Sequence, residues 1–112
     1  MAGTLKKLAG PAFFGSAAAN IYVPSAATIF GEIRHMHFAC VTTTTTVSVY
    51  VGATGGSSAG TELFKDLSIA TAAVYDYYCL LKLTSTTFLT GICAAAGDND
   101  VTYTIEGYEY VV

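Results

Sequence analysis

The segment spanning residues 33–51 constrains the fold most, because it follows a two-residue alternation that suits extended strands and not helices. In its second half, three valines alternate with Ser48 and Tyr50. The two halves are joined by five consecutive threonines, residues 42–46, whose β-branched side chains are stiff in a helix. We therefore predict a central β-hairpin, with the threonines as its polar link or as the start of the returning strand.

The first half of this segment belongs to a long strand predicted over residues 29–41. Alternation assigns two sets of side chains to its two sides, namely Arg34, Met36, Phe38 and Cys40 against Ile33, His35, His37 and Ala39. The first set is the more apolar, so we predict that it faces the core. Arg34 would then lie at the rim, with its stem on apolar surface and its guanidinium near a carboxylate.

The same alternation recurs along the chain, separated by turns of Gly, Pro, Ser, Asp and Asn. The predicted strands are residues 4–14, 20–23, 29–41, 45–51, 61–69, 74–83, 88–95 and 101–112. This pattern predicts an all-β fold, an antiparallel β-sandwich of about eight strands with a jelly-roll or immunoglobulin-like topology. We expect one domain over residues 1–112, with residues 1–15 forming an edge strand or an extended N-terminal arm because Pro11 cannot donate to a ladder.

Three local features refine this prediction. A change of alternation after Gly107 predicts a β-bulge in the last strand. Residues 52–60 contain four glycines and predict a surface loop, and residues 97–100 predict a hairpin turn rather than a calcium loop. Residues 74–83 are apolar on both sides, so this strand is either central in its sheet or covered on its outer side by a partner.

The composition excludes several classes of partner. The chain is 53% hydrophobic and only 12% charged, so its surface must be rich in Thr, Ser, Ala, Gly and Tyr, and we expect part of it to be covered by a partner or by copies of itself. The net charge is −3 and the few basic residues are scattered, which argues against nucleic-acid binding. No apolar run is long enough to span a membrane, and we do not expect the N-terminal residues to act as a signal peptide.

Few residues suggest chemistry. His35 and His37 have the spacing of metal ligands on a strand, but no third ligand is near in sequence, so we expect two half-exposed histidines on an outer face or at a subunit contact, with no metal and no other cofactor. No nucleophile motif or pair of buried carboxylates indicates an enzyme. The three cysteines are predicted to be reduced and buried, a single disulfide or a metal site being the alternatives.

The eight tyrosines, without any tryptophan, favour either an interaction surface or ordinary filling of a sheet. Lys6 and Lys7 form either a solvated pair or a contact to an acidic neighbour. The candidate interface residues are Lys6, Lys7, His35, His37, Tyr78, Leu80, Tyr108 and Tyr110.

The chain resembles short β-sandwich proteins encoded among the structural genes of tailed bacteriophages. Such proteins tend to carry a Ser-Ala-Ala-x-Ile-Tyr-x-Pro segment, an Ile-Arg-x-Ile-His-Phe strand, a Ser/Thr-rich hairpin before Val-x-Val-Tyr-Val, a glycine-rich loop, and a last strand of the form Val-Thr-x-Thr-Ile-x-Gly-x-Glu, and this chain is similar to each of these motifs. These motifs are residues 16–24, 33–38, 42–51, 52–60 and 101–109. Cys40 stands where such proteins often carry an asparagine at the end of the long strand.

The resemblance implies a virion protein that is made in the host cytoplasm and resides on the capsid surface. Its implied role is that of a decoration or cement protein, a homo-oligomer, commonly a trimer, that binds the major capsid protein and stabilises the outer surface of the head shell. The alternatives are a head-fibre, tail or baseplate module. A different class, a carbohydrate-binding β-sandwich whose exposed aromatic side chains stack on sugars, also fits the composition.

Overall fold

A computed structural model describes residues 3–52, 61–94 and 100–111. Its eight strands are β1 (Thr4–Phe13), β2 (Ala19–Tyr22), β3 (Ile29–Cys40), β4 (Thr45–Gly52), β5 (Glu62–Ile69), β6 (Val74–Leu83), β7 (Phe88–Cys93) and β8 (Val101–Val111). The predicted strands correspond to these one by one, with ends that differ by at most two residues. The predicted all-β sandwich is confirmed. The part of the glycine-rich loop over residues 53–60, and the turn at residues 97–99, lie outside the described residues.

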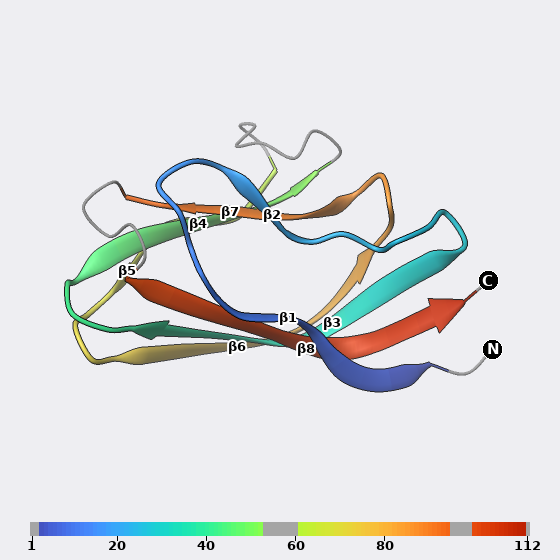
Figure 1. The fold of residues 1–112 in the computed structure, drawn as a ribbon, viewed down its shortest axis with the longest axis horizontal. Coiled ribbons are helices and arrows are strands. Elements are labelled where there is room, and N and C mark those ends of the chain that lie inside the picture. Colours follow the sequence, from blue (N-terminus) through green and yellow to red (C-terminus); the bar gives the residue numbers. More distant parts are fainter. Residues whose placement is uncertain (1–2, 53–60, 95–99, 112) are drawn as a thin grey trace.

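The strands form two antiparallel four-stranded sheets, with orders β1-β8-β3-β6 and β2-β7-β4-β5, packed face to face (Figure 1). The first strand pairs with the last, the second with the seventh, the third with the sixth and the fourth with the fifth. This nested pairing is that of a long folded ribbon rolled around a core, which is the jelly roll and not the immunoglobulin topology. The start of β1 and the end of β8 lie next to each other at one end of the sandwich.

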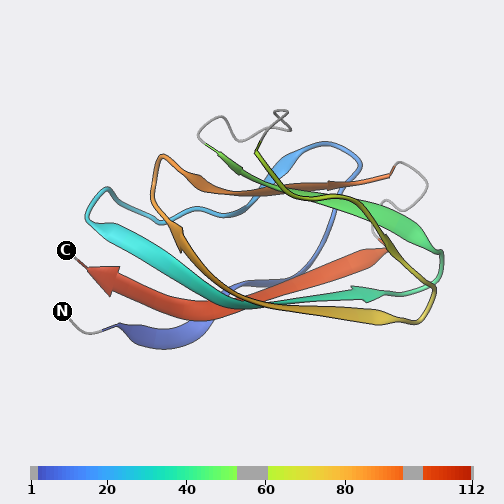
Figure 2. The ribbon, with the colours of Figure 1, turned by 180° about the vertical axis from the view of Figure 1, so that it is seen from behind.

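The predicted central hairpin is wrong. β3 and β4 lie in different sheets, so residues 41–44 carry the chain across the sandwich instead of turning it back within one sheet. Alternation shows which side of each strand is apolar and must face the core. A hairpin within one sheet and a crossing between two sheets that share a core both satisfy this requirement. Figure 2 shows the β5–β6 link, residues 70–73, crossing at the same end. Thr44 and Thr71 join the two links, because the Thr71 backbone N–H donates to Oγ1 of Thr44 over 3.0 Å.

Asp100 holds the β3–β4 crossing in place. Its carboxylate accepts hydrogen bonds from the backbone N–H and hydroxyl of Thr42, at 2.9 and 2.6 Å, and from the backbone N–H of Thr43 at 2.6 Å. The carboxylate thereby satisfies backbone donors that have left their ladder. The hydrogen bonds from Thr42 and Thr43 lower the pKa of this buried carboxyl below its ordinary value.

The core lies between the sheets and is built from the inward side chains of both. It consists of Phe14, Tyr22, Ile33, Met36, Phe38, Cys40, Val47, Val49, Ile69, Leu83, Leu89, Cys93, Val101 and Ile105. The ring of Phe38 packs edge-on against Phe14 at 5.5 Å. At the other end, Tyr22 of β2 donates a 2.6 Å hydrogen bond to Glu109 of β8, which joins the two sheets. All three cysteines are free; Cys40 and Cys93 are buried and Cys79 is half-buried, which agrees with the predicted reduced thiols.

The predicted side-chain directions of Ile33 and Arg34 need correction, and one irregularity of β3 explains both. β3 inserts Arg34 as an extra residue between Ile33 and His35, opposite the adjacent pair Gly107 and Glu106 of β8. The bulge turns Ile33 into the core and Arg34 outward, so the predicted place of Arg34 on the core side is wrong.

The predicted bulge in β8 at Gly107 is likewise wrong, because β8 keeps its alternation and its neighbours carry the extra residues. β1 inserts Leu8 opposite Glu106 and Ile105, one residue along β8 from the place where β3 inserts Arg34. A Cβ atom on Gly107 would overlap the carbonyl oxygen of Glu32, so glycine is what lets the bulged strand approach this closely.

We expect Gly107→Ala to destabilise the fold strongly, since the added methyl group meets backbone that cannot move without breaking the β3–β8 ladder. Chemical denaturation should show a loss of roughly 2 kcal/mol or more. The matched control is Gly52→Ala, where the new Cβ would lie at an ordinary 3.5 Å from Thr61. Equal stabilities of the two variants would contradict this account of the bulge.

The hydrogen bonds of Asp100 predict a pH dependence of stability. Since its folded-state pKa is lowered, its contribution is fully present above the unfolded carboxyl pKa of about 4 and is lost as the pH falls through the lower folded value. Thermal melts of the protein and of Asp100→Asn between pH 2 and 7 should converge at the acid end and separate above pH about 4. Asp66→Asn, at an exposed carboxyl, serves as the control, and the same convergence there would refute the assignment.

Candidate functional site

Exposed apolar side chains gather on the outward side of the β1-β8-β3-β6 sheet, which we call the histidine face because it carries His35 and His37. Its most exposed members are Leu5 (65%), Val74 (59%), Tyr78 (74%) and Leu80 (71%). Three of them lie on β6, whose outward residues are exposed in strict alternation. β6 is an edge strand, so it is not the central strand that its sequence also allowed. Exposed apolar surface of this kind is typical of an interaction site.

Aromatic rings cover the end of the histidine face near the C-terminus of β8. Tyr110 stacks on Phe30 at a centroid distance of 5.0 Å, and the Lys82 ammonium lies 4.4 Å above the Phe30 ring. Tyr108, the next outward residue of β8, lies beneath the Arg34 guanidinium at 5.3 Å. These contacts hold long cationic side chains flat over rings, so this end of the face is both aromatic and basic.

The bulge gives Arg34 its place on the histidine face. Its Nε donates a 2.8 Å hydrogen bond to Oε2 of Glu32, two positions earlier on the same strand. Arg34 also lines a hollow of about 420 Å³ with residues of β1, β6 and β8. The hollow is lined by Leu5, Lys6, Lys7, Arg34, His35, Tyr78, Glu106 and Gly107. Its floor is therefore partly apolar, and charges of both signs surround it.

The two histidines converge on one carboxylate from the neighbouring strand. Oδ1 of Asp76 lies 2.7 Å from Nε2 of His35 and 2.6 Å from Nδ1 of His37. The other ring nitrogen of His35, Nδ1, lies 3.0 Å from Oε1 of Glu106 on β8. The ring of Tyr78 stacks on His35 at 4.5 Å with an interplanar angle of 12°. Residues of the two neighbouring strands, β6 and β8, thus fix the His35 ring in position.

The proton state of this cluster follows from its partners. Both nitrogens of His35 face carboxylates, which only accept hydrogen bonds when ionised, so the ring carries two protons when these bonds are made. Burial lowers the pKa of His35, but the hydrogen bonds to Glu106 and Asp76 outweigh it and raise the pKa overall. Hydrogen bonds from His37 and His35 lower the pKa of the Asp76 carboxyl. The cluster is therefore a hydrogen-bonded network of charged groups.

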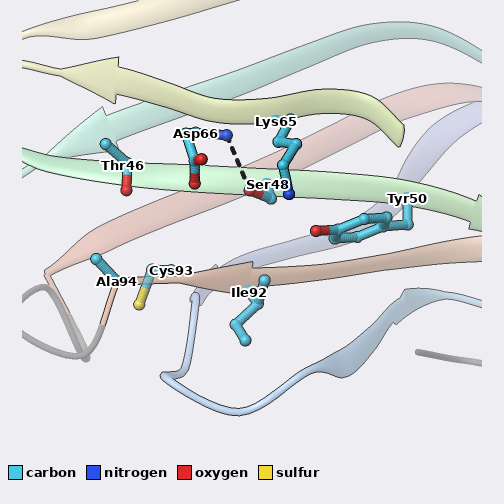
Figure 3. Close-up of a pocket in the computed structure, with 8 residues that line it drawn as sticks. All are labelled: Thr46, Ser48, Tyr50, Lys65, Asp66, Ile92, Cys93 and Ala94. Carbon is cyan, nitrogen blue, oxygen red and sulfur yellow. Dashed lines mark hydrogen bonds between the residues drawn. The ribbon is translucent and has the colours of Figure 1, made fainter. Parts of the chain in front are cut away.

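A second, smaller hollow of about 210 Å³ lies on the other sheet (Figure 3). It is lined by Thr46, Ser48, Tyr50, Lys65, Asp66, Ile92, Cys93 and Ala94. Oγ of Ser48 accepts a 2.9 Å hydrogen bond from the backbone N–H of Asp66, which has a left-handed φ of 53° in a β5 irregularity. Both histidines of the chain lie on the opposite sheet, so no histidine activates this serine.

The structure brings together most residues that sequence had suggested for an interface. Lys7, His35, His37, Tyr78, Leu80, Tyr108 and Tyr110 belong to the histidine face. Lys6 points to the other side of β1 and forms an ion pair with Glu109, at 2.8 Å. Sequence reasoning missed Asp76 and Glu106, which complete the cluster. A lone aspartate in the middle of an apolar strand was the available signal for Asp76.

Comparison with known proteins gives information on the fold and none on an activity. No family model matches the sequence, and no curated protein matches it significantly. Among solved structures, the chain is similar to a chain from Bacillus endospore appendages, described as a family of disulfide-linked pili, with 16% identity, a TM-score of 0.56, and coverage of 100% of this chain and 92% of that one. At this identity the likeness concerns the fold alone.

A second similar chain comes from infectious bursal disease virus, Gx strain, with 9% identity, a TM-score of 0.38, and coverage of 96% of this chain and 30% of that one. This score is too low to support an argument.

The described residues contain no helix of the length and apolarity that a membrane crossing requires.

Proposed function

We propose that the protein is a non-enzymatic structural component of a tailed-bacteriophage virion, and that it decorates the outer surface of the head shell. The observation that carries the proposal is the exposure of Leu5, Val74, Tyr78 and Leu80 on one sheet face. Burying such side chains contributes a favourable free energy of about 25 cal/mol per Å² of apolar area, so a complex with a partner that covers them is stabilised.

The chemistry of the histidine face suits a protein partner. Its exposed apolar and aromatic side chains lie on the two edge strands, β1 and β6, while Lys7, Arg34 and Glu106 surround the hollow between them. Protein interfaces are commonly enriched in aromatic residues and arginine, and this face carries both. The partner proposed from the phage resemblance is the major capsid protein. Copies of the chain are proposed to associate as well, as a trimer.

The cysteines argue against covalent links between neighbouring copies through this chain's thiols. Cys40 and Cys93 are buried, and burial raises the pKa of the half-buried Cys79 thiol, which keeps it protonated and unreactive. The proposed association is therefore noncovalent. This separates the proposal from the disulfide-linked assembly described for the appendage protein of similar fold.

The proposal predicts abundance on the particle and a contribution to its stability. Quantitative mass spectrometry of purified virions should find the chain in a fixed, lattice-like ratio to the major capsid protein. Virions that lack it should release their DNA at a lower temperature, and added purified protein should restore the loss. A handful of copies per virion would overturn the decoration role in favour of a fibre, tail or baseplate module.

The histidine face is tested by binding of variants to virions that lack the chain. We expect the double change Tyr78→Ser and Leu80→Ser to reduce binding at least tenfold, because it removes two exposed apolar side chains of the face. Val41→Ser is the matched control, since Val41 is also exposed (52%) but belongs to the β3–β4 crossing. Unchanged capsid binding by the double variant, or binding of glycans by the isolated protein that this variant loses, would refute the proposed contact.

A further inference from the structure

Three potential metal ligands meet on the histidine face, from positions far apart in the sequence. His35 and His37 project from β3 to the same side, and Asp76 of β6 lies directly opposite His37 in the antiparallel ladder. One nitrogen of each ring and one oxygen of the carboxylate all lie within 4.8 Å of one another. The closest approaches are the 2.7 and 2.6 Å contacts of Asp76 Oδ1 with His35 Nε2 and His37 Nδ1. Two imidazoles and one carboxylate form a common donor set for zinc.

We propose that His35, His37 and Asp76 bind a divalent transition-metal ion of the zinc type. Zinc bonds of about 2.0–2.2 Å in a tetrahedral site separate neighbouring ligand atoms by roughly 3.3 Å. The two contacts to Asp76, now 2.7 and 2.6 Å, must therefore lengthen by about 0.6–0.7 Å. Asp76 and His37 are partly exposed, so small rotations of their side chains achieve this change. The ion replaces the protons that His35 Nε2 and His37 Nδ1 now share with the carboxylate.

A second observation supports a site built for an ion. The nitrogen of His35 that faces away from Asp76, Nδ1, is hydrogen-bonded to Glu106 at 3.0 Å. Metal-bound histidines almost always donate their other N–H to a carboxylate, a carbonyl or water, which fixes the tautomer and the ring orientation. The stacked ring of Tyr78 limits the remaining rotation of His35. Glu106 is thus a positioning residue, and His35 would bind the ion through Nε2.

The donor set selects the kind of ion. Imidazole nitrogens suit Zn²⁺, Co²⁺, Ni²⁺ and Cu²⁺, whereas Ca²⁺ and Mg²⁺ prefer sites made of oxygen atoms. The three ligands leave one tetrahedral position open, for water or for a group from a partner. Since the ligands come from β3 and β6, the ion would fasten the edge strand to the sheet. The site does not depend on the proposed virion role, and either can fail without the other.

The test is a titration of chelator-treated protein with ZnCl₂, followed by calorimetry, and with CoCl₂, followed by visible absorption. We expect one ion per chain, an absorption spectrum of tetrahedral cobalt, and no heat with CaCl₂ or MgCl₂. Zinc should also raise the melting temperature of the protein, because it binds only the folded state. The absence of zinc binding would overturn the proposal.

Variants locate the site. His37→Ala and Asp76→Asn should each weaken zinc binding more than tenfold, and Glu106→Ala should weaken it about tenfold or more through His35. Glu32→Gln is the matched control, because Glu32 is a carboxylate of the same face that pairs with Arg34 and should leave zinc affinity unchanged. Circular dichroism checks that each variant keeps its β-sheet spectrum. Binding that survives both His37→Ala and Asp76→Asn would assign the ion to the thiols or elsewhere and refute this site.

Discussion

The burial of one apolar side of every strand between two sheets is the constraint on which the rest of the structure depends. Phe38, Met36 and Ile33 supply this layer from β3, and Val47 and Val49 supply it from β4. Both strands face the same core from opposite sheets, so the chain must cross between sheets after residue 40. Each crossing leaves backbone donors without ladder partners, and Asp100 satisfies those of Thr42 and Thr43.

The same constraint determines what the histidine face displays. Residues that alternate with the core must point outward, and in β6 these include Tyr78 and Leu80. The bulge at Arg34 changes the alternation of β3 at one point, so the apolar Ile33 stays in the core while Arg34 and His35 both reach the outer surface. Without the extra residue, either Ile33 would be exposed or the two histidines would point inward. A packing irregularity therefore creates the face on which we place both the partner contact and the metal site.

The candidate site was only partly predictable. His35 and His37 were visible from their spacing, because a strand places alternate residues on the same side. Asp76 and Glu106 were not, since they lie 41 and 71 positions from His35 and reach it only through the pairing of β3 with β6 and β8. Local alternation carries no information about which strands become neighbours. The sequence therefore showed two potential ligands, whereas the structure brings a third, Asp76, and the carboxylate of Glu106 beside them.

Sequence alone determined the fold class, the number of strands and their ends, because alternation, β-branched residues and turn residues act over a few neighbouring positions. The apolar sides of most strands were also readable, Val47 and Val49 among them. Only the tertiary structure decided that residues 41–44 cross between sheets, that the topology is a jelly roll, and that Arg34 turns outward. The crossing, the topology and the bulge depend on which strands pair and on the close approach of β3 to Gly107. These contacts join residues that are far apart in the sequence, so no local pattern contains them.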